Sequence, residues 1–148
     1  MQINHYLNFH GTAEVAFQFY QTVFGGEFSS LVRYGDTENE QTQSLSESEK
    51  NAIMHISLPL TEHSVLMASD VIEGFCGNHY QFIQGTNHYI SVNLEAHQQI
   101  EAQRIFNALS VNSVVETELE MTFWGALYGA LTDQFGVQWM INCQLTEA

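Results

Sequence analysis

The stretch NHYLNF at residues 4–9 recurs as NHYISV at residues 87–92, which lies 83 residues further along the chain when counted from His5 to His88. Each copy alternates polar and apolar residues, as a half-buried strand does. Each leads into a segment with the periodicity of an amphipathic helix, over residues 13–24 in the first half and 96–109 in the second. Thr12 is expected as the N-cap of the first helix, and Ile100 as part of the apolar face of the second. The repeat predicts an internal duplication.

Three further strands are expected to complete each half. They are predicted at residues 28–34, 52–60 and 64–69 of the first half and at residues 111–121, 124–132 and 137–143 of the second. Each half is then a βαβββ module, and the fold class is α+β. Because one helix covers only one face of a sheet, the two modules are expected to pair into a U-shaped mixed sheet around a central cleft, the default place for a ligand.

The whole chain, residues 1–148, is expected to form a single domain. Module one is assigned to residues 1–70, a connector to residues 71–87 and module two to residues 88–148. The acidic and polar stretch at residues 35–51 is predicted to be a mobile surface loop.

Charge excludes whole classes of partner. The chain has 3 Lys and Arg residues against 17 Asp and Glu residues, a formal net charge of -14, whereas nucleic acids and anionic membranes select clustered positive charge. No apolar run approaches the roughly 20 residues of a membrane span, and the N-terminus lacks the features of a signal peptide. Cys76 and Cys143 fit no metal-binding spacing and are interpreted as ordinary thiols, so a cytoplasmic location is expected.

Several motifs together resemble one known family. They are YLNFHG (6–11), AFQFY (16–20) and VFGG (23–26) near the start, and TFWG (122–125), YG (128–129) and TDQFGVQWMIN (132–142) near the end. The chain resembles the PhnB-like branch of the vicinal oxygen chelate superfamily, which includes glyoxalase I, bleomycin-binding resistance proteins, fosfomycin-modifying enzymes and extradiol dioxygenases. The resemblance implies the glyoxalase/bleomycin resistance/dioxygenase fold, a small-molecule ligand in the cleft and a homodimer. A demethylubiquinone methyltransferase label given to this branch is not expected to describe the activity, because the chain has no Gly-rich strand-to-helix turn for a cofactor.

The resemblance also implies where a metal would bind, since metal-dependent members place ligands near the start of the first strand and on the last strand of each module. His5 and His88 match the first-strand positions, and imidazole suits Zn, Ni, Mn or Fe. The motif Asp-x-x-Gly-x-x-x-Glu of those relatives ends here in Met140, whose thioether suits Cu(I) instead. Two interpretations stay open, half of a divalent metal site or a pair of hydrogen-bonding histidines, and the second is favoured.

Other candidates are weighed residue by residue. Asp70 ends a strand at the expected mouth of the cleft, where it could act as a general base or a third metal ligand, although a structural capping role is favoured. His55 lies on a central strand and is more often a satisfied core or cleft histidine than a catalytic one. With His5, His55 and His88, the ligand cleft is expected to include Trp124, Gln138, Met140 and Asn142.

The last strand has two alternating sets of residues. Trp139 and Ile141 are expected to pack beneath the helix, which leaves the polar set with Met140 facing a flat or partly apolar ligand. On residues 111–121, Glu116, Glu118 and Glu120 alternate toward one face, which is either a cation site or an ordinary acidic solvent face. The acidic composition favours the solvent face.

Three functions are compatible with these features. The first is a metal-independent small-molecule binding protein, favoured by Met140. The second is a metal-dependent lyase or thiol transferase of the glyoxalase I or fosfomycin-resistance type, suggested by His5 and His88. The third is a structural dimer without a ligand. Whether the protein is an enzyme stays open.

Overall fold

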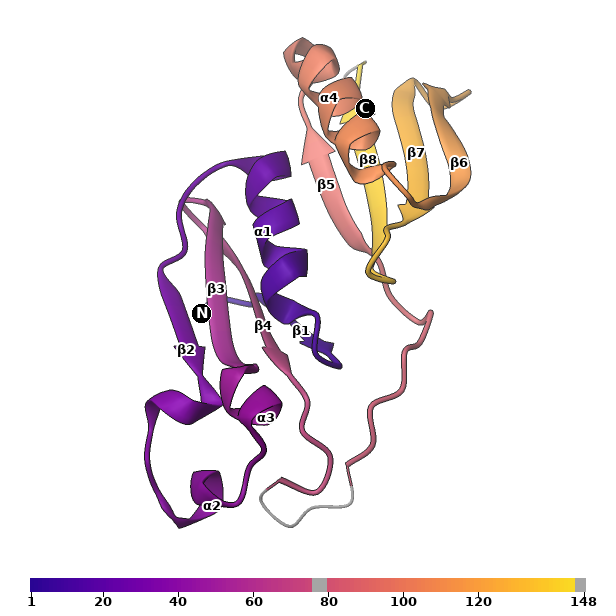
Figure 1. Cartoon of the computed structure of the whole chain (residues 1–148). Coiled ribbons are helices and arrows are strands. Elements are labelled where there is room, and N and C mark those ends of the chain that lie inside the picture. Colours follow the sequence, from indigo (N-terminus) through magenta and orange to yellow (C-terminus); the bar gives the residue numbers. More distant parts are fainter. Residues whose placement is uncertain (76–79, 146–148) are drawn as a thin grey trace. The chain divides into compact units, whose positions relative to one another are not determined.

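The computed structural model describes residues 1–75 and 80–145, so that Cys76 and part of the predicted connector lie outside the described residues. The chain divides into two compact units, Met1–Ile83 (unit 1) and Gln84–Ala148 (unit 2). The boundary falls inside the connector expected at residues 71–87. Figure 1 shows that each unit has its own sheet and its own long helix.

Unit 1 is built around a four-stranded mixed sheet of order β1-β4-β3-β2. Its elements are β1 (His5–Phe9), α1 (Ala13–Phe24), β2 (Ser30–Arg33), β3 (Ile53–Thr61) and β4 (Ser64–Asp70). β1 runs parallel to β4, whereas the other pairs are antiparallel. Helix α1 packs on β3 and β4, and its buried face includes Phe17, Tyr20 and Val23.

The segment expected to be a mobile loop is instead ordered into short helices, and that prediction was wrong. It contains η1 (Tyr34–Asp36), α2 (Glu40–Gln43) and α3 (Glu47–Asn51). The physical reason is local capping. The Ser46 hydroxyl accepts the backbone N–H of Glu49, and the Glu49 carboxylate accepts the backbone N–H of Ser46 at 2.8 Å, which closes a capping box at the start of α3.

Unit 2 repeats the arrangement with a sheet of order β5-β8-β7-β6, in which β5 runs parallel to β8. Its elements are β5 (Ile90–Leu94), η3 (Ala96–Gln98), α4 (Gln99–Leu109), β6 (Val114–Met121), β7 (Ala126–Thr132) and β8 (Gln138–Gln144). The equal strand orders are those expected of duplicated modules, and the α+β fold class is confirmed.

The core of unit 2 lies between α4 and the sheet. Trp139, Ile141 and Leu109 are fully buried there, but Ile100 is 88% exposed, so the expectation that it belongs to the apolar face of the helix was wrong. Ala102 is buried on that face of α4 instead, because a small side chain fits where the helix lies close to the sheet. In the described part of the chain, no helix is long and apolar enough to cross a membrane.

Candidate functional site

Each sheet has one face that packs beneath its own helix and one that this helix does not cover, which we call the open face. In unit 1 the ring of Phe9 meets the ring of Phe17 on α1 edge-on, with centroids 6.4 Å apart, so Phe9 faces the helix. Because side chains alternate along a strand, Tyr6 on β1 points to the open face. Its partner in β4, Met67, lies on the same face and is half-buried.

Tyr6 and His55 form the polar centre of this open face. The Tyr6 hydroxyl lies 3.1 Å from Nδ1 of His55, and the two ring centroids are 5.7 Å apart. His55 is half-buried on β3. The pair offers a ligand one hydroxyl, one imidazole and two flat ring surfaces.

The register places His5 on the other face of the sheet. His5 shares the parity of Leu7 and Phe9, so it lies on the helix-bearing side, where its side chain is exposed at the beginning of β1. The structure therefore brings Tyr6, and not His5, beside His55. Tyr6 lies on the open face beside His55, and it was not among the residues expected in the cleft.

His88 precedes β5 by two residues, and its Nδ1 lies 3.5 Å from Oδ1 of Asn87. It shares the parity of Ile90, which pairs with the buried Trp139. Tyr89 again is the residue that turns to the open face. A metal held jointly by His5 and His88 stays a prediction.

The open face of unit 2 carries the polar set of β8. Trp139 and Ile141 are fully buried under α4, and Met140 and Asn142, which alternate with them, are half-buried on the opposite face. Cys143 belongs to the helix side, where its thiol donates to the backbone carbonyl of Glu95, and burial raises the pKa of that thiol. Cys143 is a buried free thiol, and its raised pKa lowers the share of the reactive thiolate.

Tyr89 and Glu116 form a hydrogen-bonded cluster that spans this open face. The Tyr89 hydroxyl donates to Oε2 of Glu116 at 2.5 Å, and the hydroxyl of Thr132 donates to Oε1 at 2.9 Å. The hydrogen bond to Glu116 raises the pKa of Tyr89 above its ordinary value, because the charged acceptor stabilises the phenol over the phenolate. Both carboxylate oxygens of Glu116 are thus engaged.

The solvent face favoured for the three glutamates agrees with their exposed side chains, and Glu116 is in addition hydrogen-bonded to Tyr89 and Thr132. Register shifts between Val115 and Thr117, and between Thr117 and Glu120, break the alternation on which the three glutamates were assigned to one face. Such bulges leave no clear sequence signal. The sequence repeat, in which Tyr89 corresponds to Tyr6, was the sequence signal that could have indicated this cluster.

Gln138 lies beneath this cluster. Its side chain is only 6% exposed, and its Oε1 is a buried acceptor for which the described residues supply no hydrogen-bond partner. A hydrogen bond from the Gln138 amide to Tyr89 acts on the pKa of that tyrosine in the direction opposite to Glu116. Gln138 stands opposite Thr132 in the β7–β8 register.

Trp124 lies at the turn between β6 and β7 and is 49% exposed. Its ring meets the ring of Tyr128 at a centroid distance of 6.0 Å. Tyr128 pairs with Asn142 in the sheet and therefore shares its open face. The aromatic surface expected at Trp124 thus continues onto the open face of unit 2.

Asp70 is tied into the framework of unit 1. Its Oδ1 accepts the backbone N–H groups of Gly11 at 3.0 Å and Ala13 at 2.9 Å, and its Oδ2 accepts that of Ile53 at 2.9 Å. Asp70 is 3% exposed. Thr12 was expected to cap α1, but its side chain makes no capping hydrogen bond. Asp70 accepts the backbone N–H of Ala13 at the start of the helix instead. This bonding supports the structural role favoured for Asp70.

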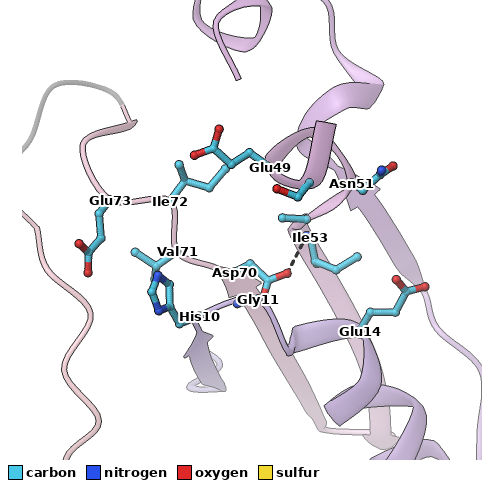
Figure 2. A pocket seen from close by; sticks show the side chains of 12 residues that line it. His10, Gly11, Glu14, Glu49, Asn51, Ile53, Asp70, Val71, Ile72 and Glu73 are labelled. Carbon is cyan, nitrogen blue, oxygen red and sulfur yellow. Dashed lines mark hydrogen bonds between the residues drawn. The ribbon is translucent and has the colours of Figure 1, made fainter. Parts of the chain in front are cut away.

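A pocket of about 680 Å³ opens beside Asp70 within unit 1 (Figure 2). Its lining includes the carboxylates of Glu14, Glu49, Asp70 and Glu73. Each of these accepts a hydrogen bond from a neighbouring group: Arg33 for Glu14, Ser46 for Glu49 and Phe82 for Glu73, besides those to Asp70. The pocket therefore lies where the start of α1, the end of α3 and the end of β4 meet, and each of its four carboxylates already accepts at least one hydrogen bond.

Comparison with known families identifies the chain. The family model described as 3-demethylubiquinone-9 3-methyltransferase matches residues 1–142. The chain belongs to this family. The resemblance stated from the sequence is confirmed.

The chain is similar to several known proteins over nearly the whole length of both chains. The chain is 35% identical to protein PA1353 from Pseudomonas aeruginosa, whose crystal structure superposes with a TM-score of 0.82 over 97% of this chain and 98% of that one. Protein YjdN from Escherichia coli is 27% identical over 96% of this chain and 95% of its own. A putative PhnB protein from Bacillus cereus is 23% identical, with a TM-score of 0.71 over 97% and 99% of the two chains.

Distant structures share the fold alone. FosX from Listeria monocytogenes, a fosfomycin resistance protein solved with Mn(II) and sulfate, is 10% identical with a TM-score of 0.56 over 97% of this chain and 90% of that one. A glyoxalase/bleomycin resistance/dioxygenase protein from Nocardioides is 14% identical, with a TM-score of 0.59 over 100% and 85% of the chains. The glyoxalase/bleomycin resistance fold expected for this family member is confirmed.

Within either unit, the described side chains do not form a donor set for a divalent metal. Met140 places a thioether on the open face of β8, where the metal-dependent pattern has a carboxylate. Across residues 1–75 and 80–145, no group of three or more His, Cys, Asp or Glu side chains is placed to hold a metal ion.

The description of the family names a methyltransferase, but membership of the family is a statement about descent and fold. The two sheets have one parallel pair each and the orders β1-β4-β3-β2 and β5-β8-β7-β6. The Gly-rich cofactor turn of doubly wound methyltransferases belongs to an open parallel sheet with a different order. The family name therefore assigns no reaction to this chain.

Proposed function

We propose that this protein binds a small organic molecule and that the open faces of its two sheets contact it. One observation carries the proposal. In each unit the helix-bearing face is apolar core, whereas the open face holds polar and polarisable side chains. These are the exposed Tyr6 with the half-buried His55 and Met67 in unit 1, and the half-buried Tyr128, Met140 and Asn142 in unit 2.

This composition favours a flat, partly apolar ligand. Thioether and aromatic side chains make adaptable contacts with ring systems, and the hydroxyl, imidazole and amide groups orient the ligand by hydrogen bonds. The proposal concerns binding and assigns no reaction. The cleft expected from pairing of the modules stays a prediction.

The methionines allow a direct test, because Met67 and Met140 lie on the open faces whereas Met1 and Met121 are exposed elsewhere. Protein labelled with ¹³C in the methionine methyl groups is titrated with pools of phenolic and heteroaromatic molecules. We expect selected molecules to shift the Met67 and Met140 signals and leave those of Met1 and Met121 unchanged. Pools that shift no methionine, or all of them alike, would contradict the proposal.

A metal measurement separates this function from a metal-dependent lyase or thiol transferase. Wild type, His5→Ala and His88→Ala are loaded with Zn, Ni, Mn and Fe, dialysed and analysed for metal content. We expect no variant-dependent retention, because a thioether stands at the carboxylate position. Retention of about one metal per chain by wild type, lost in both variants, would favour the lyase or transferase.

We also propose that the protein works in the cytoplasm as a homodimer. The acidic composition and the ordinary Cys143 thiol support the location, and the implied behaviour of the family supports the dimer. Light scattering coupled to gel filtration tests the assembly. A mass of 16.8 kDa at all concentrations would contradict the dimer.

A further inference from the structure

We infer that Tyr89, Glu116 and Gln138 form a subsite on unit 2 for a protonated amine or guanidinium group of the bound molecule. The inference rests on the proposed function, since it names the chemistry of one end of the ligand. It is argued from the balance of hydrogen-bond donors and acceptors, from charge, and from the position of Tyr89.

The cluster has more acceptors than donors. Glu116 contributes two carboxylate oxygens, and Gln138 contributes an Oε1 that is buried and has no partner among the described residues. A buried acceptor without a donor is rare in folded proteins because desolvating it weakens the fold. A ligand that completes the cluster must therefore bring N–H or O–H donors.

The charge of Glu116 selects among such donors. The chain has three Lys and Arg residues, and each pairs with another carboxylate: Arg33 with Glu14, Lys50 with Glu47, and Arg104 with Glu101. Among the residues that the structure describes, Glu116 is thus bonded by the neutral hydroxyls of Tyr89 and Thr132. Charge-assisted hydrogen bonds are shorter and stronger than neutral ones, so a cationic donor competes well for this carboxylate.

Aromatic rings border the same place. Tyr128 lies close enough to Tyr89 to act on it electrostatically, and the ring of Trp124 adjoins that of Tyr128. The faces of tyrosine and tryptophan rings attract ammonium and guanidinium groups. The surroundings of the cluster therefore favour the same class of ligand as its charge does.

Tyr89 occupies the subsite in this structure. Its hydroxyl donates to Glu116 as a ligand N–H would, and it also hydrogen-bonds with the Gln138 side chain. Tyr89 immediately precedes β5, which begins at Ile90, and therefore lies at the edge of the regular strand. Entry of the ligand then displaces the hydroxyl from Glu116 and brings a donor within reach of Oε1 of Gln138.

Two matched probes test the subsite. Benzylammonium and benzyl alcohol share a ring and a size but differ in charge and in the number of donors. Each is titrated into ¹⁵N-labelled protein while the side-chain amide of Gln138 and the indole of Trp124 are followed by NMR. We expect benzylammonium to bind at least about tenfold more tightly than benzyl alcohol and to shift the Gln138 amide.

Three variants sharpen the result. Glu116→Gln should abolish the preference for the cation, whereas Glu118→Gln, which removes the same charge from the same strand, should keep it. Tyr89→Phe should bind benzylammonium more tightly, because it removes the competing donor. Equal losses in Glu116→Gln and Glu118→Gln would overturn the subsite, and weaker binding by Tyr89→Phe would overturn the displacement.

The outcome also separates this inference from the proposed function. If both probes shift the methyl signal of Met140 with equal affinity in wild type and in Glu116→Gln, the open face binds ligands and the subsite is wrong. If neither probe shifts Met67, Met140 or the Gln138 amide, both are wrong.

Discussion

Asp70, the last residue of β4, accepts the backbone N–H of Ala13, the first residue of α1, at 2.9 Å. The same carboxylate also accepts the N–H of Ile53, at the start of β3. One buried side chain thus satisfies groups that helix and strand geometry leave unpaired. Removing this carboxylate should therefore destabilise both α1 and β3.

Asp70→Asn should lower the free energy of unfolding by about 2–4 kcal/mol, because an amide retains one acceptor and turns N–H donors toward backbone N–H groups. Urea unfolding followed by circular dichroism measures the change. Glu62→Gln, an exposed residue between β3 and β4, is the control and should cost less than about 0.5 kcal/mol. A stable Asp70→Asn protein would contradict the role assigned to Asp70.

The ion pair of Glu14 and Arg33 should make stability depend on pH. Arg33 donates to both carboxylate oxygens of Glu14 at 2.8 Å, and this hydrogen bonding holds the pKa of Glu14 below its ordinary value. The folded state then binds a proton less readily than the unfolded state. Its stabilising contribution is fully present above the unfolded pKa and is lost as the pH falls through the folded pKa.

Both side chains are about one-third exposed, at 36% for Glu14 and 30% for Arg33, so solvent screening keeps the contribution small. Glu14→Gln should destabilise the protein by about 0.5–1 kcal/mol near pH 7, and the difference from wild type should be smaller near pH 3. Urea unfolding at both pH values checks this. A difference that persists at the lower pH would assign the effect of the substitution to packing.

Gly129 on β7 leaves room for α4. A Cβ at this position would lie 2.6 Å from Cε2 of Phe106 and 3.0 Å from Cα of Leu119. Gly129→Ala should therefore destabilise the protein by about 1–3 kcal/mol, because the helix or β6 must shift. Gly85→Ala is the matched control, since its Cβ would meet nothing nearer than 4.0 Å. Equal melting temperatures for the two variants would contradict the close packing.

Gln138→Met should raise the stability of the protein by about 1 kcal/mol, because it removes a buried acceptor that has no partner and preserves the shape of the side chain. The same change should weaken the binding of benzylammonium. Thermal unfolding and titration are measured on the same preparation. Lower stability with unchanged binding would show that Gln138 is satisfied in solution and does not serve the ligand.

Sequence periodicity predicted the main elements closely, because long amphipathic segments bounded by Gly are strong local signals. The start and end of α1 agree with expectation, and the strands agree within a few residues. The capping box Ser46-x-x-Glu49 was present in the sequence, but its acidic and polar surroundings were interpreted as a loop. Short helices held by local caps give no hydrophobic periodicity.

The candidate site was harder to predict than the fold, because its residues are set by strand faces and long-range contacts. His5 was chosen by its resemblance to a ligand position, although the alternation that makes Leu7 and Phe9 core residues assigns the open face to Tyr6. Glu116 depends on bulges in β6, and Asp70 on contacts with residues far away in the chain. Neither long-range pairing nor bulges can be seen in a local pattern.

The parallel pairing of the outer strands affects how the chain folds as it is made. β1 leaves the ribosome first but must wait for β4, the last strand of its unit, to become its partner, and β5 must likewise wait for β8. Closing such long loops is slow compared with forming a hairpin. During synthesis the first strand of each half therefore stays unpaired until the whole half has emerged, which makes that interval the one in which a chaperone or another nascent strand can capture it.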